Sequence, residues 1–356
     1  MTEQINKKVN YWQELRAICI FFVMMIHCTN PLQLENQVQF QWSMFFWIVE
    51  RNIVNCAVAV FIFMAGYFVK QSVVKQNTRK WLTKRCKRLL IPYSVWTLVY
   101  VFIKYDYGAG IWHLPVRFLK SLVLGGAAPQ LYYIVVLFQL TLLTPVLLKV
   151  WGSDRKILRM FFILLTPLYL LALTVYGLLL HRTLPHYQVP FLGWLIYYLI
   201  GLFYSKQIGE IVKKQQKTIL YVLAGGLLGC LGSYGLLFLD YPLSGIISQL
   251  RITNMIYSIL VICCVMQLSM HQSQLMPKCF EIDLMDIGDI SYGIYFIHYI
   301  PILIVQNLVT SKLYGFIGLP FLQLLEFLVA LIFSVVICWT VKKIIGNKSS
   351  GLLLGI

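Results

Sequence analysis

The sequence predicts an all-α integral membrane protein, built as a bundle of about ten transmembrane helices. The chain has 356 residues, of which 59% are hydrophobic and only 12% are charged, whereas a soluble globular domain carries about 25% charged residues. Apolar runs long enough to cross a bilayer recur along the whole chain between short polar breaks. These runs predict helices at 12–30, 53–70, 89–106, 131–150, 160–180, 190–205, 218–239, 250–270, 290–310 and 321–341.

The distribution of Lys and Arg predicts that both termini lie in the cytoplasm. The net charge is +17, and most of the 30 basic residues fall in segments that ten spans place on one side of the membrane. The densest of these segments runs from Lys70 to Arg88. Because cytoplasmic segments are enriched in Lys and Arg, topology and attraction to anionic lipid explain the charge. A nucleic-acid partner is therefore not expected.

The segments between the spans predict little further structure. Residues 40–52 are aromatic and read as an interfacial stretch, with Glu50 and Arg51 as a neutralised pair that has no assigned role. Residues 108–128 are rich in Gly and Pro and predict a long loop or a partly re-entrant segment. The nine cysteines show no metal-ligand spacing, so no metal is predicted. One transmembrane domain is expected over 1–345, followed by a short flexible tail at 346–356.

Arg16 and His27 lie eleven residues apart in the first apolar run. At about 100° and about 1.5 Å per residue, they share one helix face and lie roughly 16 Å apart along the axis. A helix that spans the bilayer holds His27 well inside the apolar core. An ionisable group at that depth is costly and indicates a functional site. The alternative is a histidine whose hydrogen bonds are satisfied at a helix end.

A basic cluster precedes the third predicted span. Arg85 and Arg88 are three residues apart, so they are neighbours on one helix face, and Lys84 adjoins them. Such a pair can hold a ligand with several phosphates through charge-assisted, bidentate hydrogen bonds. The alternative is that these charges only fix the topology.

A late helix carries polar residues on one face. Ser291, Tyr295 and His298 fall at positions i, i+4 and i+7. From the residues alone they either line an interior pocket or act as ordinary anchors at a membrane interface, where Tyr and His are common. Asp286 and Asp289 precede this face and are read as helix N-terminal charges.

Several stretches, taken in order, resemble motifs of the acyltransferase 3 family of integral membrane acyltransferases. The chain departs from the family pattern where Ala65 replaces a serine, Lys84 an arginine and Tyr132 a tryptophan. The hydroxyl that Ala65 lacks cannot act here, and Lys84 keeps the charge but loses the bidentate fork. The matching stretches lie at 15–27, 61–67, 84–92, 131–133, 197–201 and 290–298.

The resemblance implies transfer of an acyl group, usually acetyl from acetyl-CoA, to a hydroxyl of a cell-envelope carbohydrate or lipid-linked sugar precursor. It makes His27 the catalytic residue and Arg16 its partner. Acetyl-CoA is then a co-substrate, and no bound cofactor is expected. The expected location is the plasma membrane of a bacterium. By the same resemblance, Lys84, Arg85 and Arg88 bind the donor, and Tyr133, Ser291, Tyr295 and His298 line the pocket.

The residues leave some alternatives open. His27 can act as a general base towards the hydroxyl or can itself carry the acyl group. A transporter or flippase of a polar envelope precursor would also have many spans, buried charge and a lined cavity. A sensory or transport module is a third reading, weakened because no soluble domain is visible in the sequence.

Overall fold

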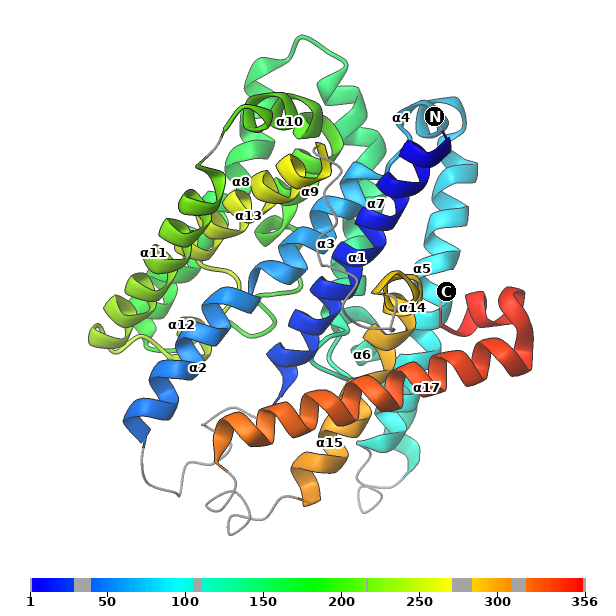
Figure 1. The fold of residues 1–356 in the computed structure, drawn as a ribbon, viewed down its shortest axis with the longest axis vertical. Coiled ribbons are helices and arrows are strands. Elements are labelled where there is room, and N and C mark those ends of the chain that lie inside the picture. The colour runs from blue at the N-terminus through cyan, green and yellow to red at the C-terminus, as the bar shows by residue number, and fades with distance from the viewer. Residues whose placement is uncertain are drawn as a thin grey trace.

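The computed structural model describes residues 2–28, 40–104, 111–215, 217–270, 284–308 and 318–354. Every regular element in these ranges is a helix, which confirms the all-α class (Figure 1). The helices are α1 (Thr2–His27), α2 (Phe40–Val54), α3 (Cys56–Tyr67), α4 (Gln71–Gln76), α5 (Thr78–Ile103), η3 (Ile111–His113), α6 (Leu114–Leu124), α7 (Tyr132–Trp151), α8 (Lys156–Leu180), η4 (Phe191–Gly193), α9 (Leu195–Leu199), η5 (Ile200–Tyr204), α10 (Ser205–Lys213), α11 (Thr218–Phe238), α12 (Leu243–Ile246), α13 (Ile252–Met270), α14 (Leu284–Ile297), α15 (Tyr299–Leu308) and α17 (Leu319–Leu353).

Seven helical segments among the described residues are long and apolar enough to cross a membrane, and the bent pair α14 and α15 is an eighth candidate. Ten spans were expected. The first predicted span lies in α1, which begins with a polar stretch. The sixth, at 190–205, is divided into the short helices η4, α9 and η5. Residues 309–310, at the end of the ninth predicted span, lie outside the described residues.

Two expectations about the connecting segments are corrected. Residues 40–52 are not a separate interfacial stretch: most of α2 continues into α3 as one candidate span, Phe45–Tyr67. Residues 114–124 form the helix α6, because Pro115 lies in its first turn and Gly125 ends it in a left-handed conformation. Tyr93 Oη donates to the carbonyl oxygens of Ser121 (3.1 Å) and Leu122 (2.8 Å), and so attaches α6 to α5.

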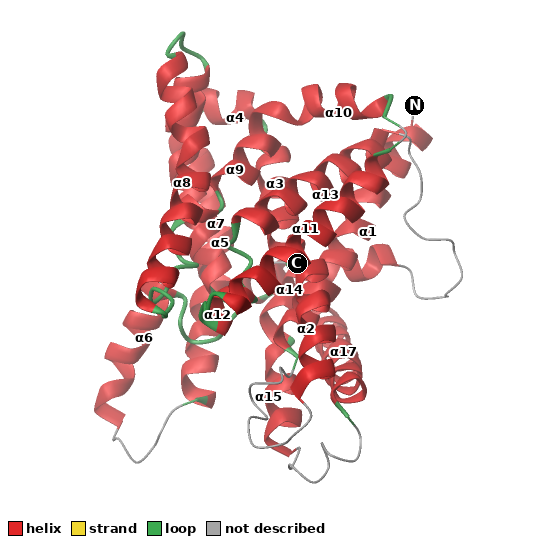
Figure 2. Ribbon diagram, turned by 90° about the vertical axis from the view of Figure 1, so that its left-hand side faces the viewer, coloured by secondary structure: helices red, strands yellow, loops and turns green. Residues whose placement is uncertain are grey.

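Helix α1 lies in the centre of the bundle, packed against α14, α3 and α17 (Figure 1). Its closest approach to α14 is at Gly288, where an added Cβ would lie 2.1 Å from the carbonyl oxygen of Gln13. The N-terminal end of α1, α4 and α10 gather at one end of the molecule, and α4 and α10 lie across that end (Figure 2). We call this end the N-terminal end of the bundle.

Helix α3 crosses α9 and η5 with the two backbones in contact. A Cβ on Gly66 would lie 2.4 Å from the carbonyl oxygen of Tyr198, and a Cβ on Gly201 would lie 2.1 Å from the carbonyl oxygen of Phe63. Each glycine thus makes room for the backbone of the other helix. Residues 200–204 form a π-helix at this crossing, a local widening that is frequent near functional sites.

The last helices contain two sharp changes of direction. The chain bends by 52° between α14 and α15, and His298 is the residue at the break. Helix α17 changes direction at Gly346, whose φ is 71°. Beyond it the chain, expected to be a flexible tail, is helical as far as Leu353. The carbonyl oxygen of Leu353 accepts a hydrogen bond from Trp96 Nε1 at 3.0 Å, and Leu354 is buried.

Candidate active site

His27 is the last residue of α1, and its half-buried ring lines a cavity of about 170 Å³ that we call the histidine cavity. The rest of the wall comes from the helices α2, α3, α7 and α14 and from the segments before α7, η4 and α13. The cavity is the smaller of two cavities described below, and it has room for a small group such as an acyl group. Its lining residues are Val23, Ile26, His27, Arg51, Val58, Pro129, Gln130, Tyr132, Tyr133, Gln188, Gln249 and Tyr295.

The imidazole of His27 packs against two rings from the break between α14 and α15. Its centroid lies 5.4 Å from the centroid of the His298 ring and 5.7 Å from that of Tyr299. Lys104 Nζ lies 4.9 Å from the Tyr299 ring centroid, and burial lowers the pKa of this lysine. His298, which was expected to line a pocket, is next to His27 but lines neither this cavity nor the second cavity described below.

Arg51 also lines the histidine cavity, although it was assigned no role from the sequence. Its Nη1 donates to the carbonyl oxygen of Ile26 at 2.5 Å, so the guanidinium is fixed beside the end of α1. Its Nε is buried without a hydrogen-bond partner. The signal that could have indicated Arg51 is a permanent charge in a run that is otherwise apolar enough to span a membrane.

The remaining polar lining of the histidine cavity offers both donors and acceptors. Gln130 Nε2 donates to Tyr100 Oη at 3.0 Å, whereas Gln130 Oε1 is buried and unpartnered. Tyr132 Oη donates to Gln249 Oε1 at 3.2 Å. A hydroxyl group both donates and accepts hydrogen bonds. A cavity wall with an unpartnered donor, Arg51 Nε, and an unpartnered acceptor therefore suits a ligand that carries hydroxyls.

A second cavity, of about 460 Å³, lies further along α1 towards the N-terminal end of the bundle, and we call it the arginine cavity. Arg16 of α1, Arg85 and Arg88 of α5 and Lys342 of α17 bring four positive charges to it, and Asp289 brings one negative charge. Its lining residues are Gln13, Arg16, Phe61, Met64, Ala65, Phe68, Arg85, Arg88, Leu89, Tyr133, Leu137, Gly288, Asp289, Ser291, Tyr292, Tyr295 and Lys342.

Arg16 is held in place by contacts with its surroundings in the arginine cavity. Its Nη1 donates to Gln13 Oε1 at 2.8 Å, and its guanidinium lies 5.4 Å from the centroid of the Phe68 ring. Gln13 Nε2 in turn donates to Asp289 Oδ1, which links α1 to α14. Asp289 therefore has a partner of its own, while Asp286 lies in the first turn of α14 as expected.

The predicted donor-binding residues are only partly brought together. Arg85 and Arg88 line the arginine cavity with Arg16, whereas Lys84 is exposed and lines neither cavity. Lys342 lies more than 250 residues away in sequence, and no local motif marks it. Arg16 and His27 were predicted to share one helix face. In the structure they line different cavities: Arg16 lines the arginine cavity and His27 lines the histidine cavity.

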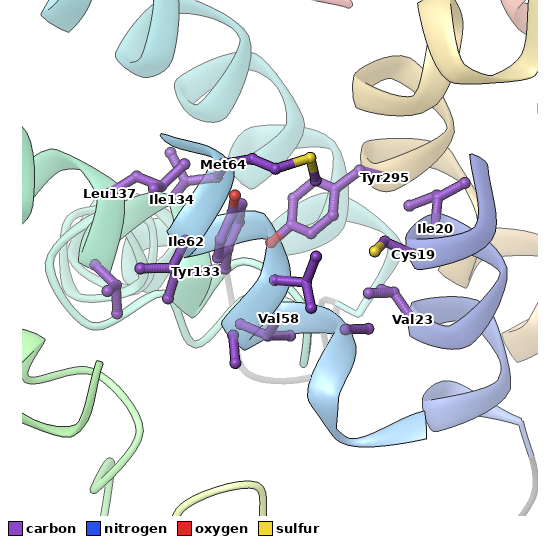
Figure 3. Close-up of a cluster of buried hydrophobic side chains, with 14 of the residues drawn as sticks. Cys19, Ile20, Val23, Val58, Ile62, Met64, Tyr133, Ile134, Leu137 and Tyr295 are labelled. Atoms are coloured by element: carbon purple, nitrogen blue, oxygen red, sulfur yellow. The ribbon is translucent and has the colours of Figure 1, made fainter. Parts of the chain in front are cut away.

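Tyr133 and Tyr295 line both cavities. Their ring centroids lie 5.5 Å apart, and Tyr295 Oη donates to the carbonyl oxygen of Gln130. Figure 3 shows the Tyr295 ring reaching from α14 into the space between α1, α3 and α7, among apolar side chains such as Val58 and Met64. The two tyrosines thus form a narrow boundary between a cationic cavity and a small polar cavity. Ser291, the other predicted residue of this helix face, lines the arginine cavity and donates to Gly288 O at 2.7 Å.

The comparison with protein families found one match that covers nearly the whole chain. A family model described as an acyltransferase domain, of the acyltransferase 3 type, matches residues 9–343. This range contains both cavities and every lining residue named above. Neither the curated proteins nor the solved structures gave a match.

Proposed function

The chain belongs to the acyltransferase 3 family of membrane acyltransferases, and on that premise we propose that it moves an acetyl group from acetyl-CoA to a hydroxyl of a cell-envelope carbohydrate or lipid-linked sugar precursor. The observation that carries the proposal is the pair of cavities of different size and charge that share Tyr133 and Tyr295. One cavity suits a phosphorylated donor and the other suits a hydroxyl-bearing acceptor.

The proposed topology has ten spans in the plasma membrane of a bacterium, with both termini in the cytoplasm. The positive-inside rule supports this orientation, because the N-terminal end of the bundle carries the basic segment from Lys70 to Arg88 and the basic helix α10. The arginine cavity then opens towards the cytoplasm, where acyl-CoA is made. The histidine cavity lies nearer the outer side.

In this proposal the arginine cavity binds the phosphates and the pantetheine arm of the donor. Guanidinium groups bind phosphate through paired, charge-assisted hydrogen bonds. Arg85 and Arg88 are neighbours on α5, and Arg16 enters the same cavity from α1, where it is held by Gln13. We assign the phosphates to Arg85, Arg88 and Lys342, and the amide and thioester end of the donor to Arg16.

The chemistry is assigned to the histidine cavity. The hydroxyl oxygen of the acceptor bonds to the acyl carbon while its proton passes to His27, the general base. The C–S bond breaks, and the departing thiolate takes that proton and leaves as the free thiol of CoA. Arg51 is beside His27 and stabilises the negative charge that develops on the acyl oxygen. The alternative is that His27 carries the acyl group between two half-reactions.

A flippase that moves a polar precursor without covalent chemistry remains the alternative from another class. Its polar cavity would need no affinity for CoA, whereas the acyltransferase requires that affinity. The family match favours the acyltransferase.

Thermal unfolding of the detergent-purified protein with acetyl-CoA tests the donor site. A ligand that binds only the folded state stabilises it by about 2.7 kcal/mol at 100 times its dissociation constant. We expect stabilisation that depends on acetyl-CoA concentration and that is lost in the double variant Arg85→Ala, Arg88→Ala. An equal Tm with and without millimolar acetyl-CoA would contradict the proposal and favour the flippase.

A further inference from the structure

His298 is a fully buried histidine at the break between α14 and α15, with 0% of its surface exposed. A residue of α5 stabilises the break, since Tyr100 Oη donates a hydrogen bond to the carbonyl oxygen of Phe296 at 2.6 Å. Pro301, which has no N–H, follows within one turn. A buried ionisable residue at such a fixed position needs a reason, because burying a polar group without partners is costly.

The hydrogen bonds of His298 determine which of its ring nitrogens carries the proton. Nδ1 lies 3.0 Å from the carbonyl oxygen of Ile294. A carbonyl oxygen only accepts, so Nδ1 must be the donor and carry the hydrogen. In the neutral ring Nε2 is then an acceptor. Nε2 is buried and has no partner. The ring therefore presents one unused acceptor in a position fixed by the backbone.

The ring of His27 is the nearest titratable neighbour that His298 contacts. Their ring centroids lie 5.4 Å apart with the ring planes tilted by 36°, so the two rings are in contact although no hydrogen bond joins them in this structure. Arg51, Lys104 and the phenol of Tyr299 also face His27.

We propose that His298 is the positioning residue of His27, accepting through Nε2 a hydrogen bond from the N–H of the His27 ring. The inference rests on the acyl transfer proposed above. With one His27 nitrogen held in this way, the other is fixed as the acceptor that faces the histidine cavity. It takes the proton from the acceptor hydroxyl and returns it to the departing thiolate. His298 stays neutral throughout and exchanges no proton.

Two substitutions separate positioning from mere packing. His298→Leu fills the space but removes the acceptor. In His298→Gln the side-chain oxygen takes the place of Nε2, so the acceptor is kept while the bond to Ile294 is lost. In metal sites, loss of the partner that orients a ligating histidine typically costs about 10-fold to 100-fold, and we expect a loss of the same order here. We expect kcat to fall about 100-fold in His298→Leu and to be largely restored in His298→Gln, with the KM for acetyl-CoA unchanged in both.

The control is His181→Leu, which removes an exposed histidine whose Nδ1 contacts the carbonyl oxygen of Asp240 and which lines neither cavity. Its kcat should match that of the unmodified protein. Stabilisation by acetyl-CoA in all variants shows that each is folded. Equal kcat in His298→Leu and the unmodified protein, or equal losses in His298→Leu and His298→Gln, would overturn the role of His298 and leave the acyltransferase intact. No acetyl transfer by the unmodified protein would overturn both.

Discussion

Tyr133 and Tyr295 face each other across the centre of the bundle, with ring centroids 5.5 Å apart, and each lines both cavities. One ring comes from the start of α7 and the other from the last turn of α14. In the proposed function, the acetyl thioester at the end of the pantetheine arm reaches the histidine cavity beside these rings.

Removing one of the two rings should connect the cavities. In Tyr295→Ala we expect water to reach the thioester, so that hydrolysis of acetyl-CoA rises relative to transfer to the acceptor. Tyr295→Phe keeps the ring and loses only the hydrogen bond to Gln130, and it serves as the matched control. Release of free CoA thiol, measured with and without an acceptor, gives the ratio. An unchanged ratio in Tyr295→Ala would show that the ring does not separate the two cavities.

Arg51 should matter for the rate of transfer and not for binding of the donor. Removing one group that stabilises a developing oxyanion typically lowers kcat by 10²–10³-fold. We expect a loss of this size in Arg51→Gln, a smaller loss in Arg51→Lys, and an unchanged KM for acetyl-CoA. Initial rates at several donor concentrations separate kcat from KM. A raised KM with normal kcat would instead place Arg51 in the donor site.

The two neighbouring basic residues of α5 should behave differently. Arg88 lines the arginine cavity, whereas Lys84 lines neither cavity. We therefore expect Arg88→Ala to raise the KM for acetyl-CoA at least about 10-fold, since a hydrogen bond to a charged group contributes about 1.5–3 kcal/mol. We expect Lys84→Ala to leave the KM within about twofold. Equal effects would mean that the charge of the whole segment, and not the cavity, attracts the donor.

Gly66 and Gly201 should be required for folding and not for chemistry. An added methyl group meets backbone at both positions, and overpacking typically costs 1–3 kcal/mol. We expect Gly66→Ala and Gly201→Ala each to lower the Tm of the purified protein. Gly235→Ala is the control, because no atom lies within 4 Å of its added Cβ, and it should leave the Tm equal or slightly higher. A normal Tm in Gly66→Ala would show that α3 can shift.

The sequence predicted the membrane class, the position of α1 and the polar face of the late helix, because these depend on hydropathy and helical spacing. It paired Arg16 with His27, whereas the structure places Arg16 with Arg85 in the arginine cavity. It did not predict that Lys342 or Arg51 joins a cavity, since spacing along one helix does not say which helix lies beside it. The break at His298 was also missed, because hydropathy alone made 290–310 one continuous span. Gly66 and Gly201, in the stretches 61–67 and 197–201, were used only as part of the family resemblance. The structure shows that each lies where the backbone of the other helix leaves no room for a side chain.

Acetyl transfer that depends on His27 is the most direct test of the central claim. Inverted membrane vesicles expose the cytoplasmic side and carry the envelope precursors of the host. They would be incubated with acetyl-labelled CoA, using the unmodified protein and the variant His27→Ala at equal membrane abundance. We expect labelled acetyl groups in a glycan or lipid-linked fraction, and mild alkali should release them as acetate. Free CoA thiol should be formed at the same time. Both the labelled ester and the thiol should be absent in His27→Ala. Finding neither labelled ester nor thiol release above the level of His27→Ala would contradict the central claim.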